Sequence, residues 1–244
     1  MQKITYFLLI LAIYACNTGD KKPAVITGSE QNAVYYRDVF ASESGDVPGN
    51  IYADTLEFVE LVQQGDIGLF YVRRANQLKA LAVENPVAAQ FGFLRGDIVS
   101  IQWKRDSIWI EGNGSAPEVT EYLVGATKIR DGAVSGFNQK HAKPIKAEYH
   151  EQYNFTPQFV KNMRNIVEEY LAGTVDPVFR GWLTDTAANI VFSIEEGQKE
   201  GRFYNILGIR KAEEAEPVKW LFVDVDNHQV YELYAPSDSL VPAR

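Results

Sequence analysis

The sequence predicts an α+β fold, in which a β-rich meander or small barrel is followed by a helix packed on a four-stranded antiparallel sheet. Three observations predict this class. Short segments between residues 33 and 136 alternate apolar and polar side chains, as strands do. A single strongly amphipathic segment then begins at Thr156. Four apolar segments, separated by short polar turns, complete the chain.

The first 32 residues are set apart from the rest. An apolar run, Ile4–Ala15, follows Lys3 and ends at Cys16, which is the only cysteine of the chain. A bilayer span needs roughly 20 apolar residues, so this run is too short to cross a membrane, but it suits the hydrophobic region of a secretion signal. We therefore predict a signal peptide over residues 1–15 and a polar, flexible tether over residues 16–32.

The end of the apolar run resembles the lipobox of bacterial lipoproteins, in which an aliphatic, a variable and a small residue precede a cysteine. Ile13, Ala15 and Cys16 match this pattern, and Tyr14 occupies its variable position. The resemblance implies lipid on the Cys16 sulfur, cleavage before Cys16, and acylation of the new amino group by a fatty acid such as palmitate. The alternative is a secreted protein with an unmodified cysteine.

The same resemblance implies a location in the bacterial cell envelope. Asn17 follows the cysteine where some bacteria read an aspartate as an inner-membrane retention signal, so the family rule favours the outer membrane. Whether the body faces the periplasm or the cell surface is left open.

Composition limits the partners. The chain has 244 residues, a net charge of -8 and no basic stretch longer than a pair, which argues against binding to nucleic acid. A lone cysteine also leaves no intrachain disulfide to stabilise an exported protein. With 46% hydrophobic residues, the chain can rely on an apolar core instead.

Residues 33–136 are predicted to form the β-rich domain. Ile98–Trp103 alternates, and Ile108–Ile110 returns after the polar stretch Lys104–Ser107, which together predict a hairpin. Further strands are predicted at Thr55–Val62, Leu69–Val72 and Leu78–Val83. The first of these also carries helix-capping signals, but its β-branched and aromatic residues favour a strand.

Residues 137–244 are predicted to form the α+β domain. Thr156 is a good N-cap, Pro157 suits the first helical position, and Gly173 can end the helix. Strands are predicted at Asn189–Ile194, Phe203–Ile209, Val218–Val225 and Gln229–Tyr234. The order of elements is similar to that of cystatin-like and nuclear-transport-factor-like folds. That resemblance implies a binding or inhibitory module more than an enzyme.

One group of polar residues has the chemistry of a metal site. Glu148 and His150 would share one face of an extended segment, and His141 lies upstream. Two imidazoles and a carboxylate can bind zinc. Their spacing matches no H-E-x-x-H pattern, however, so we expect surface residues, with no metal and no cofactor.

A second group has the chemistry of acid–base catalysis. Asp224 and Asp226 share a strand face, with His228 just beyond them, and paired carboxylates can act as acid and base. A tight turn at Asp226 and Asn227 explains the same residues, because Asp and Asn tolerate a left-handed backbone. The sequence has neither a G-x-S-x-G elbow nor a phosphate-binding G-x-x-x-x-G-K-[ST] loop.

Trp182 is the candidate ligand-binding aromatic residue. It lies between the predicted helix and sheet, where a loop could present it outward to line a pocket. Trp103 and Trp220 alternate with apolar residues in strands, so we expect both in the core.

Two functions follow from these observations. The first is a non-enzymatic, lipid-anchored module that binds an envelope protein, a glycan or a small apolar ligand. The second is a periplasmic hydrolase that uses Asp224 and Asp226, or Glu148 and His150. A cleft that joins these side chains would favour the hydrolase.

We expect mass spectrometry of the membrane fraction to find the mature chain beginning at Cys16 with fatty acyl groups attached. Two or more chains make an anchor stable, so the protein should stay with the membrane. A freely diffusing protein with an unmodified Cys16 thiol would contradict the assignment.

Overall fold

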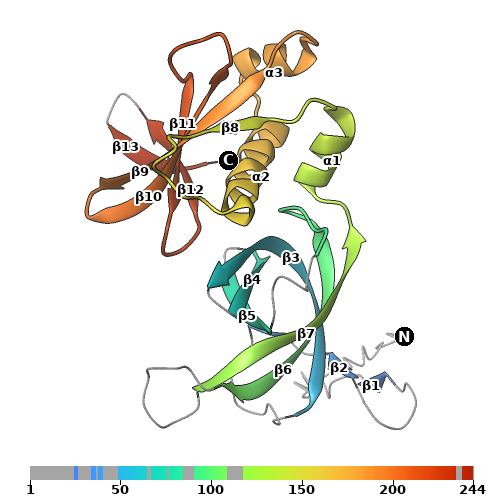
Figure 1. The fold of residues 1–244 in the computed structure, drawn as a ribbon. Coiled ribbons are helices and arrows are strands. Elements are labelled where there is room, and N and C mark those ends of the chain that lie inside the picture. The colour runs from blue at the N-terminus through green and yellow to red at the C-terminus, as the bar shows by residue number, and fades with distance from the viewer. Residues whose placement is uncertain are drawn as a thin grey trace, which may run out of the picture.

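The computed structural model describes residues 25–26, 34–36, 38–40, 49–64, 67–75, 77–84, 91–108, 118–234 and 238–243. Cys16 and most of the predicted tether lie outside this part of the chain. Within the tether, Val25–Ile26 form a strand that pairs with Val34 and Tyr35, so the prediction of a flexible segment over all of residues 16–32 is wrong. About half of the described residues are in strands, which form two sheets, and about a fifth are in three helices (Figure 1). The predicted α+β class is therefore wrong, because the fold is mostly β.

The first sheet contains the strands that precede the helices. They are β1 (Val25–Ile26), β2 (Val34–Tyr36), β3 (Ile51–Gln64), β4 (Ile67–Arg74), β5 (Gln77–Glu84), β6 (Ile98–Ile108) and β7 (Glu118–Arg130). Strands β3, β4, β5, β7 and β6 pair in that order, and β3 also pairs with β6. This second pairing closes five strands into a barrel, the architecture found in OB-folds.

Strand β3 closes the barrel because its two halves have different partners. Tyr52 to Glu57 pair with β6, whereas Glu57 to Gln64 pair with β4. The register shifts between Phe58 and Glu60, as at a β-bulge, which bends a strand and increases its twist. The pairing of β5 with β7, which also closes the barrel, is much shorter. These strands run parallel and pair only at Ala82 and Tyr122 among the described residues.

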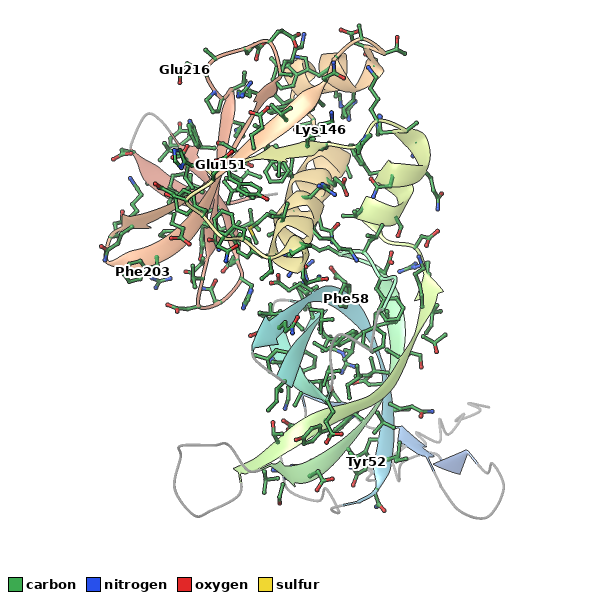
Figure 2. All side chains as sticks on the ribbon, viewed as in Figure 1. Tyr52, Phe58, Lys146, Glu151, Phe203 and Glu216 are labelled. Atoms are coloured by element: carbon green, nitrogen blue, oxygen red, sulfur yellow. The ribbon has the colours of Figure 1, made fainter. Side chains whose placement is uncertain are left out.

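The barrel interior is apolar. Figure 2 shows Phe58 at the end of the barrel nearest the helices and Tyr52 at the opposite end. The buried side chains between them include Phe70, Val72, Leu81, Val99, Ile101 and Trp103. Trp103 is thus in the core, as predicted.

The predicted hairpin in this region is wrong. Strand β6 runs through Lys104–Ser107 without a turn, and it pairs with β7. Lys104 and Asp106 alternate with their neighbours on one side of the strand and form an ion pair of 2.6 Å, so a charged stretch can remain extended. No strand was predicted at β7, because its Val119, Val124 and Ile129 are exposed and hide the two-residue period.

The second sheet has six strands, not the predicted four. They are β8 (Lys146–Glu148), β9 (Ile190–Lys199), β10 (Arg202–Lys211), β11 (Lys219–Asp224), β12 (Val230–Tyr234) and β13 (Ser239–Pro242). They pair in the order β13-β12-β11-β10-β9-β8, all antiparallel except β8 with β9. The strand predicted at Asn189–Ile194 is longer in the structure: β9 continues to Lys199, and the turn to β10 falls at Glu200 and Gly201.

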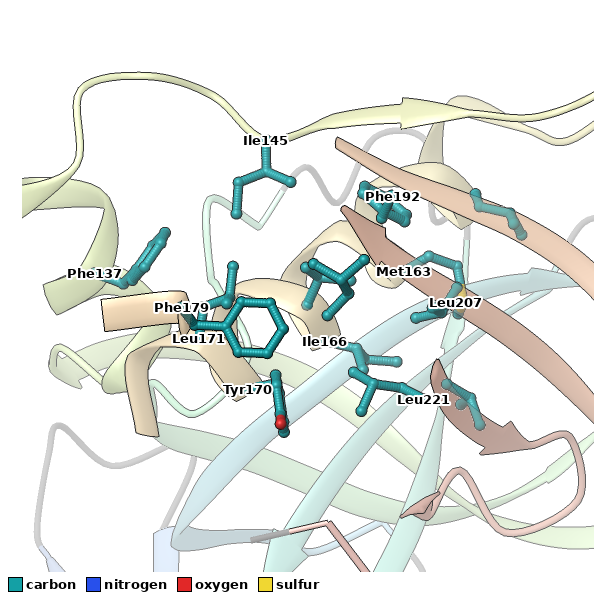
Figure 3. Close-up of a cluster of buried hydrophobic side chains, with 14 of the residues drawn as sticks. Phe137, Ile145, Met163, Ile166, Tyr170, Leu171, Phe179, Phe192, Leu207 and Leu221 are labelled. Atoms are coloured by element: carbon teal, nitrogen blue, oxygen red, sulfur yellow. The ribbon is translucent and has the colours of Figure 1, made fainter. Parts of the chain in front are cut away.

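Three helices accompany this sheet: α1 (Ala133–Lys140), α2 (Pro157–Gly173) and α3 (Pro177–Thr184). Helix α2 begins as predicted, with the Thr156 hydroxyl accepting a hydrogen bond of 3.2 Å from the Phe159 N–H. Its apolar face packs on the sheet in the second core (Figure 3). No helix of the described residues is both long and apolar enough to cross a membrane.

The passage from the barrel to the helices is fixed by Asp97. This buried carboxylate accepts hydrogen bonds from the Leu94 N–H at 2.9 Å, the Gly132 N–H at 2.8 Å and the Ser135 hydroxyl at 2.6 Å. The Lys128 ammonium lies 3.3 Å away. Because Ser135 belongs to α1 and Leu94 precedes β6, Asp97 ties the first helix to the end of the barrel.

Helix α2 also contacts the barrel directly. The Asn162 amide donates to the Leu61 carbonyl oxygen at 3.0 Å, and the buried Arg95 donates to Glu169 at 2.6 Å. Arg73 of β4 contacts the same Glu169 at 3.3 Å. These polar contacts hold the two sheets in one arrangement.

We expect Gly132→Ala to lower the free energy of unfolding by about 1–3 kcal/mol, because overpacking forces neighbouring atoms to shift. A β-carbon at this position would lie 2.1 Å from the Gly96 carbonyl carbon. Urea denaturation measures the change. Gly136→Ala is the matched control: its β-carbon would meet nothing within 4 Å, and removing a helical glycine should stabilise the protein by about 0.5–1 kcal/mol. Equal effects of the two variants would contradict the close approach.

Candidate functional site: a cleft between barrel and sheet

A cleft of about 610 Å³ lies where the barrel, helix α2 and the second sheet meet. We call it the junction cleft. The barrel contributes side chains from β3 and β4, the start of α2 contributes a second wall, and the turn after β11 contributes a third. The lining residues used below are Glu60, Tyr71, Asn154, Phe155, Phe159, Glu196, Asn205, Asp224, Asp226 and His228.

A carboxylate–imidazole pair joins two of these walls. Glu60 is only 4% exposed, and its Oε1 lies 2.5 Å from Nδ1 of His228. The His228 ring also lies 4.4 Å from the Tyr71 ring, centroid to centroid. His228 has a positive φ of 57°, which few non-glycine residues adopt. The contacts with Glu60 and Tyr71 thus hold the turn after β11 against the barrel in a strained backbone conformation.

Tyr71 enters the cleft as a neutral phenol. Burial, and then the nearby charge of Glu60, raise the pKa of Tyr71 above its ordinary value. Its hydroxyl therefore keeps its proton at neutral pH and can donate a hydrogen bond to a ligand.

Asp224 braces the turn that carries His228. Its Oδ1 accepts hydrogen bonds from the backbone N–H groups of Asp226 at 2.9 Å and Asn227 at 3.2 Å, and its Oδ2 lies 3.4 Å from Arg202. Asp226 itself is exposed. The structure thus brings Asp224, Asp226 and His228 to one cleft, where Asp224 already has three donors.

The other predicted polar residues do not form one site, because His141 lies apart from Glu148 and His150. Glu148 forms an ion pair with Arg210, and Nδ1 of His150 accepts a hydrogen bond of 3.2 Å from the Gln152 N–H. Both line a neighbouring hollow of about 500 Å³, whereas His141 lines a different cavity. The described residues contain no group of three His, Cys, Asp or Glu side chains placed to hold a metal ion.

Trp182 lies in helix α3, so the prediction that a loop presents it outward is wrong. It is 8% exposed and packs edge-on against Phe179, with 5.0 Å between the ring centroids. One side of Trp182 nevertheless lines the cavity that contains His141, which has a volume of about 350 Å³.

Sequence reasoning missed Glu60 and Tyr71. Glu60 stands between Val59 and Leu61 in β3, and an acid flanked by buried apolar residues was the available signal. Nothing local marks Tyr71, because its partner His228 is distant in sequence and reaches it only through the docking of the second sheet.

The electrostatic character of the cleft is acidic. Among the described residues, four carboxylates line it, Glu60, Glu196, Asp224 and Asp226, and no lysine or arginine does. A polyanion would meet like charge there, which costs binding energy. A neutral or positively charged polar ligand fits the lining better.

Comparisons with known proteins do not assign a family. No protein-family model and no curated protein sequence matches the chain. Among solved structures, it is similar to asparaginyl-tRNA synthetase of Entamoeba histolytica, with 6% identity and a TM-score of 0.27 over 69% of this chain and 51% of that one. A putative aspartyl-tRNA synthetase from Leishmania major Friedlin gives 5% identity and a TM-score of 0.27, over 71% of this chain and 49% of that one. The chain thus spans about half the length of these synthetases, and TM-scores this low carry no conclusion about fold or function.

The Glu60–His228 contact can be measured by a double-mutant cycle with Glu60→Gln and His228→Asn, since Asn tolerates a positive φ. Residues in direct contact couple by about 0.5–3 kcal/mol, and we expect a value in that range from urea denaturation. The exposed pair of Lys104 and Asp106 is the control and should couple by no more than about 1 kcal/mol. A coupling energy near zero would mean that Glu60 and His228 do not join the two walls of the cleft in solution.

Proposed function

We propose that this chain is a non-enzymatic binding module, anchored in the bacterial cell envelope by lipid on Cys16, and that the junction cleft holds a polar segment of an envelope protein or glycan. The observation that carries the proposal is the cleft itself. Its volume of about 610 Å³ lies within the range of roughly 300–1,000 Å³ that is usual for ligand sites. Both sheets and α2 build it, so the arrangement of the two sheets determines its shape.

The lining suits recognition of a polar ligand. Tyr71, Phe155 and Phe159 offer aromatic faces, on which apolar parts of a ligand can stack. Asn154 and Asn205 add amide groups that donate and accept hydrogen bonds. The charged side chains in the described part of the lining are carboxylates, so a nucleic acid is disfavoured as the ligand.

Binding is better supported than hydrolysis by the roles that the carboxylates already have. Asp224 is engaged by two backbone N–H groups and Arg202, and Glu60 contacts His228. A catalytic acid or base must reach the substrate proton directly or through one water. Among these residues, the exposed Asp226 is the carboxylate without such a role in the fold.

The anchor supports an envelope partner. The first described strand, β1, begins only nine positions after Cys16, so lipid on Cys16 would hold the folded body close to the membrane surface. A partner in the same membrane or in the adjacent layer is then within range of the cleft.

In-cell photo-crosslinking tests this proposal. We expect a photoreactive amino acid in place of Asn154, an exposed residue of the cleft lining, to give a discrete adduct with an envelope protein or glycan. Val119 is the matched control position, because it is exposed on the barrel and does not line the cleft. Glu196→Lys should reduce the adduct if the ligand is positively charged, and leave it unchanged if the ligand is neutral.

Two outcomes would contradict the proposal. Equal adducts from positions 119 and 154 would mean that the cleft does not select a partner. Turnover of a bound molecule that is lost in both Glu60→Gln and His228→Asn would favour the hydrolase instead.

A further inference from the structure

A separate cavity lies between the ends of helices α1 and α3, and we call it the α1–α3 cavity. Its volume is about 350 Å³. The ends of the two helices, the segment between α1 and β8, and the start of β9 form its walls. The lining residues used below are Phe137, Lys140, His141, Ala142, Lys143, Ile145, Trp182, Asp185 and Ala188.

The floor of this cavity is apolar and well packed. Phe137, Ile145, Trp182 and Ala188 are all buried members of the second core cluster. Figure 3 shows Phe137 and Ile145 at the edge of that cluster. The edge-on contact with Phe179 fixes the orientation of Trp182. An apolar ligand body would thus meet a preformed surface, which limits the entropy lost on binding.

The rim of the cavity carries positive charge. Lys140 and Lys143 are both exposed, and Asp185 is the one carboxylate among the lining residues that the structure describes. Oδ1 of Asp185 already accepts a hydrogen bond of 2.8 Å from the Ala187 N–H. The two lysines therefore give the side chains of the rim a net charge of +1, which contrasts with the acidic junction cleft.

Lys143 is held in place at this rim. Its ammonium group donates to the Thr186 carbonyl oxygen and, at 3.4 Å, to the Ala188 carbonyl oxygen. It thereby bridges from the segment before β8 to the loop between α3 and β9. An ammonium group has three N–H donors, so one remains for a ligand.

The C-terminal ends of α1 and α3 carry partial negative charge, which offsets the positive charge of the rim only in part. Both helices finish at the cavity, where their last carbonyl groups are partially negative. The backbone N–H of His141 satisfies the Phe137 carbonyl oxygen, and the N–H of Asp185 satisfies that of Gly181. The full charges of Lys140 and Lys143 outweigh the partial charges that remain.

We infer that the α1–α3 cavity binds a small amphiphilic anion, whose apolar body lies on Trp182 and Ile145 and whose carboxylate lies at Lys143 and Lys140. The charge of the rim and the apolar floor together favour an amphiphilic anion over two simpler ligands. A fully apolar molecule would leave the ammonium groups unused, and a small inorganic anion would leave the floor unfilled.

Three probes of equal chain length test this inference: octanoate, 1-octanol and octylamine. Each is titrated into the lipid-anchored protein in detergent and into the soluble Cys16→Ser variant, by calorimetry. We expect octanoate to bind at least about tenfold more tightly than octylamine, a difference of about 1.4 kcal/mol. Tryptophan fluorescence should change with octanoate in the parent and not in Trp182→Phe.

Variants separate the charge from the apolar floor. Lys143→Gln should weaken octanoate binding by about fivefold or more while leaving 1-octanol unchanged. Lys146→Gln is the matched control, because Lys146 is exposed on β8 and does not line the cavity. Ala142→Trp should block the mouth for all three probes, and since Ala142 is exposed, this change spares the core.

The inference is overturned by any of three results. These are octanoate and octylamine binding with equal affinity, octanoate failing to bind at millimolar concentration, and Ala142→Trp leaving octanoate affinity unchanged. None of these results bears on the junction cleft, which has a different lining and a separate test.

Discussion

The buried carboxylate of Asp97 is the constraint on which the arrangement of this protein depends. Removing a partner from a buried charge typically costs about 3–5 kcal/mol, so a buried Asp persists only when donors surround it. Asp97 has four such donors, from Leu94, Lys128, Gly132 and Ser135. They belong to both sides of the connection between barrel and helices. The direction in which the chain leaves the barrel is thereby fixed by one side chain.

The junction cleft follows from that direction. Once α1 leaves the barrel at this angle, α2 can lie against β3, where Asn162 reaches the Leu61 carbonyl oxygen and Arg95 reaches Glu169. The second sheet then brings His228 to Glu60. These interfacial contacts are polar or charged, and such an interface is specific in geometry but modest in net stabilisation. The shape of the cleft therefore depends on the relative orientation of the two sheets, which these polar contacts determine, more than on burial of apolar side chains between them.

The sequence predicted the elements whose signals are local. Thr156 and Pro157 mark the start of α2 by capping chemistry that acts within one turn, and the β-branched and aromatic residues of Thr55–Val62 correctly favoured a strand. The pairing of β6 with β7 and the contact of Glu60 with His228 could not be predicted, because both join residues that are distant in the chain. Helix α3 was predicted as a loop around Trp182, because its eight residues give too little periodicity to identify a helix.

The parallel contact between β5 and β7 has a consequence for how the barrel opens. Antiparallel neighbours elsewhere in the barrel share long ladders, whereas this seam has one residue pair, Ala82 with Tyr122, among the described residues. Local opening begins where the fewest backbone hydrogen bonds must break. The barrel therefore opens first between β5 and β7. Backbone amide protons beside this pairing become accessible to solvent while the other strands of the barrel stay paired.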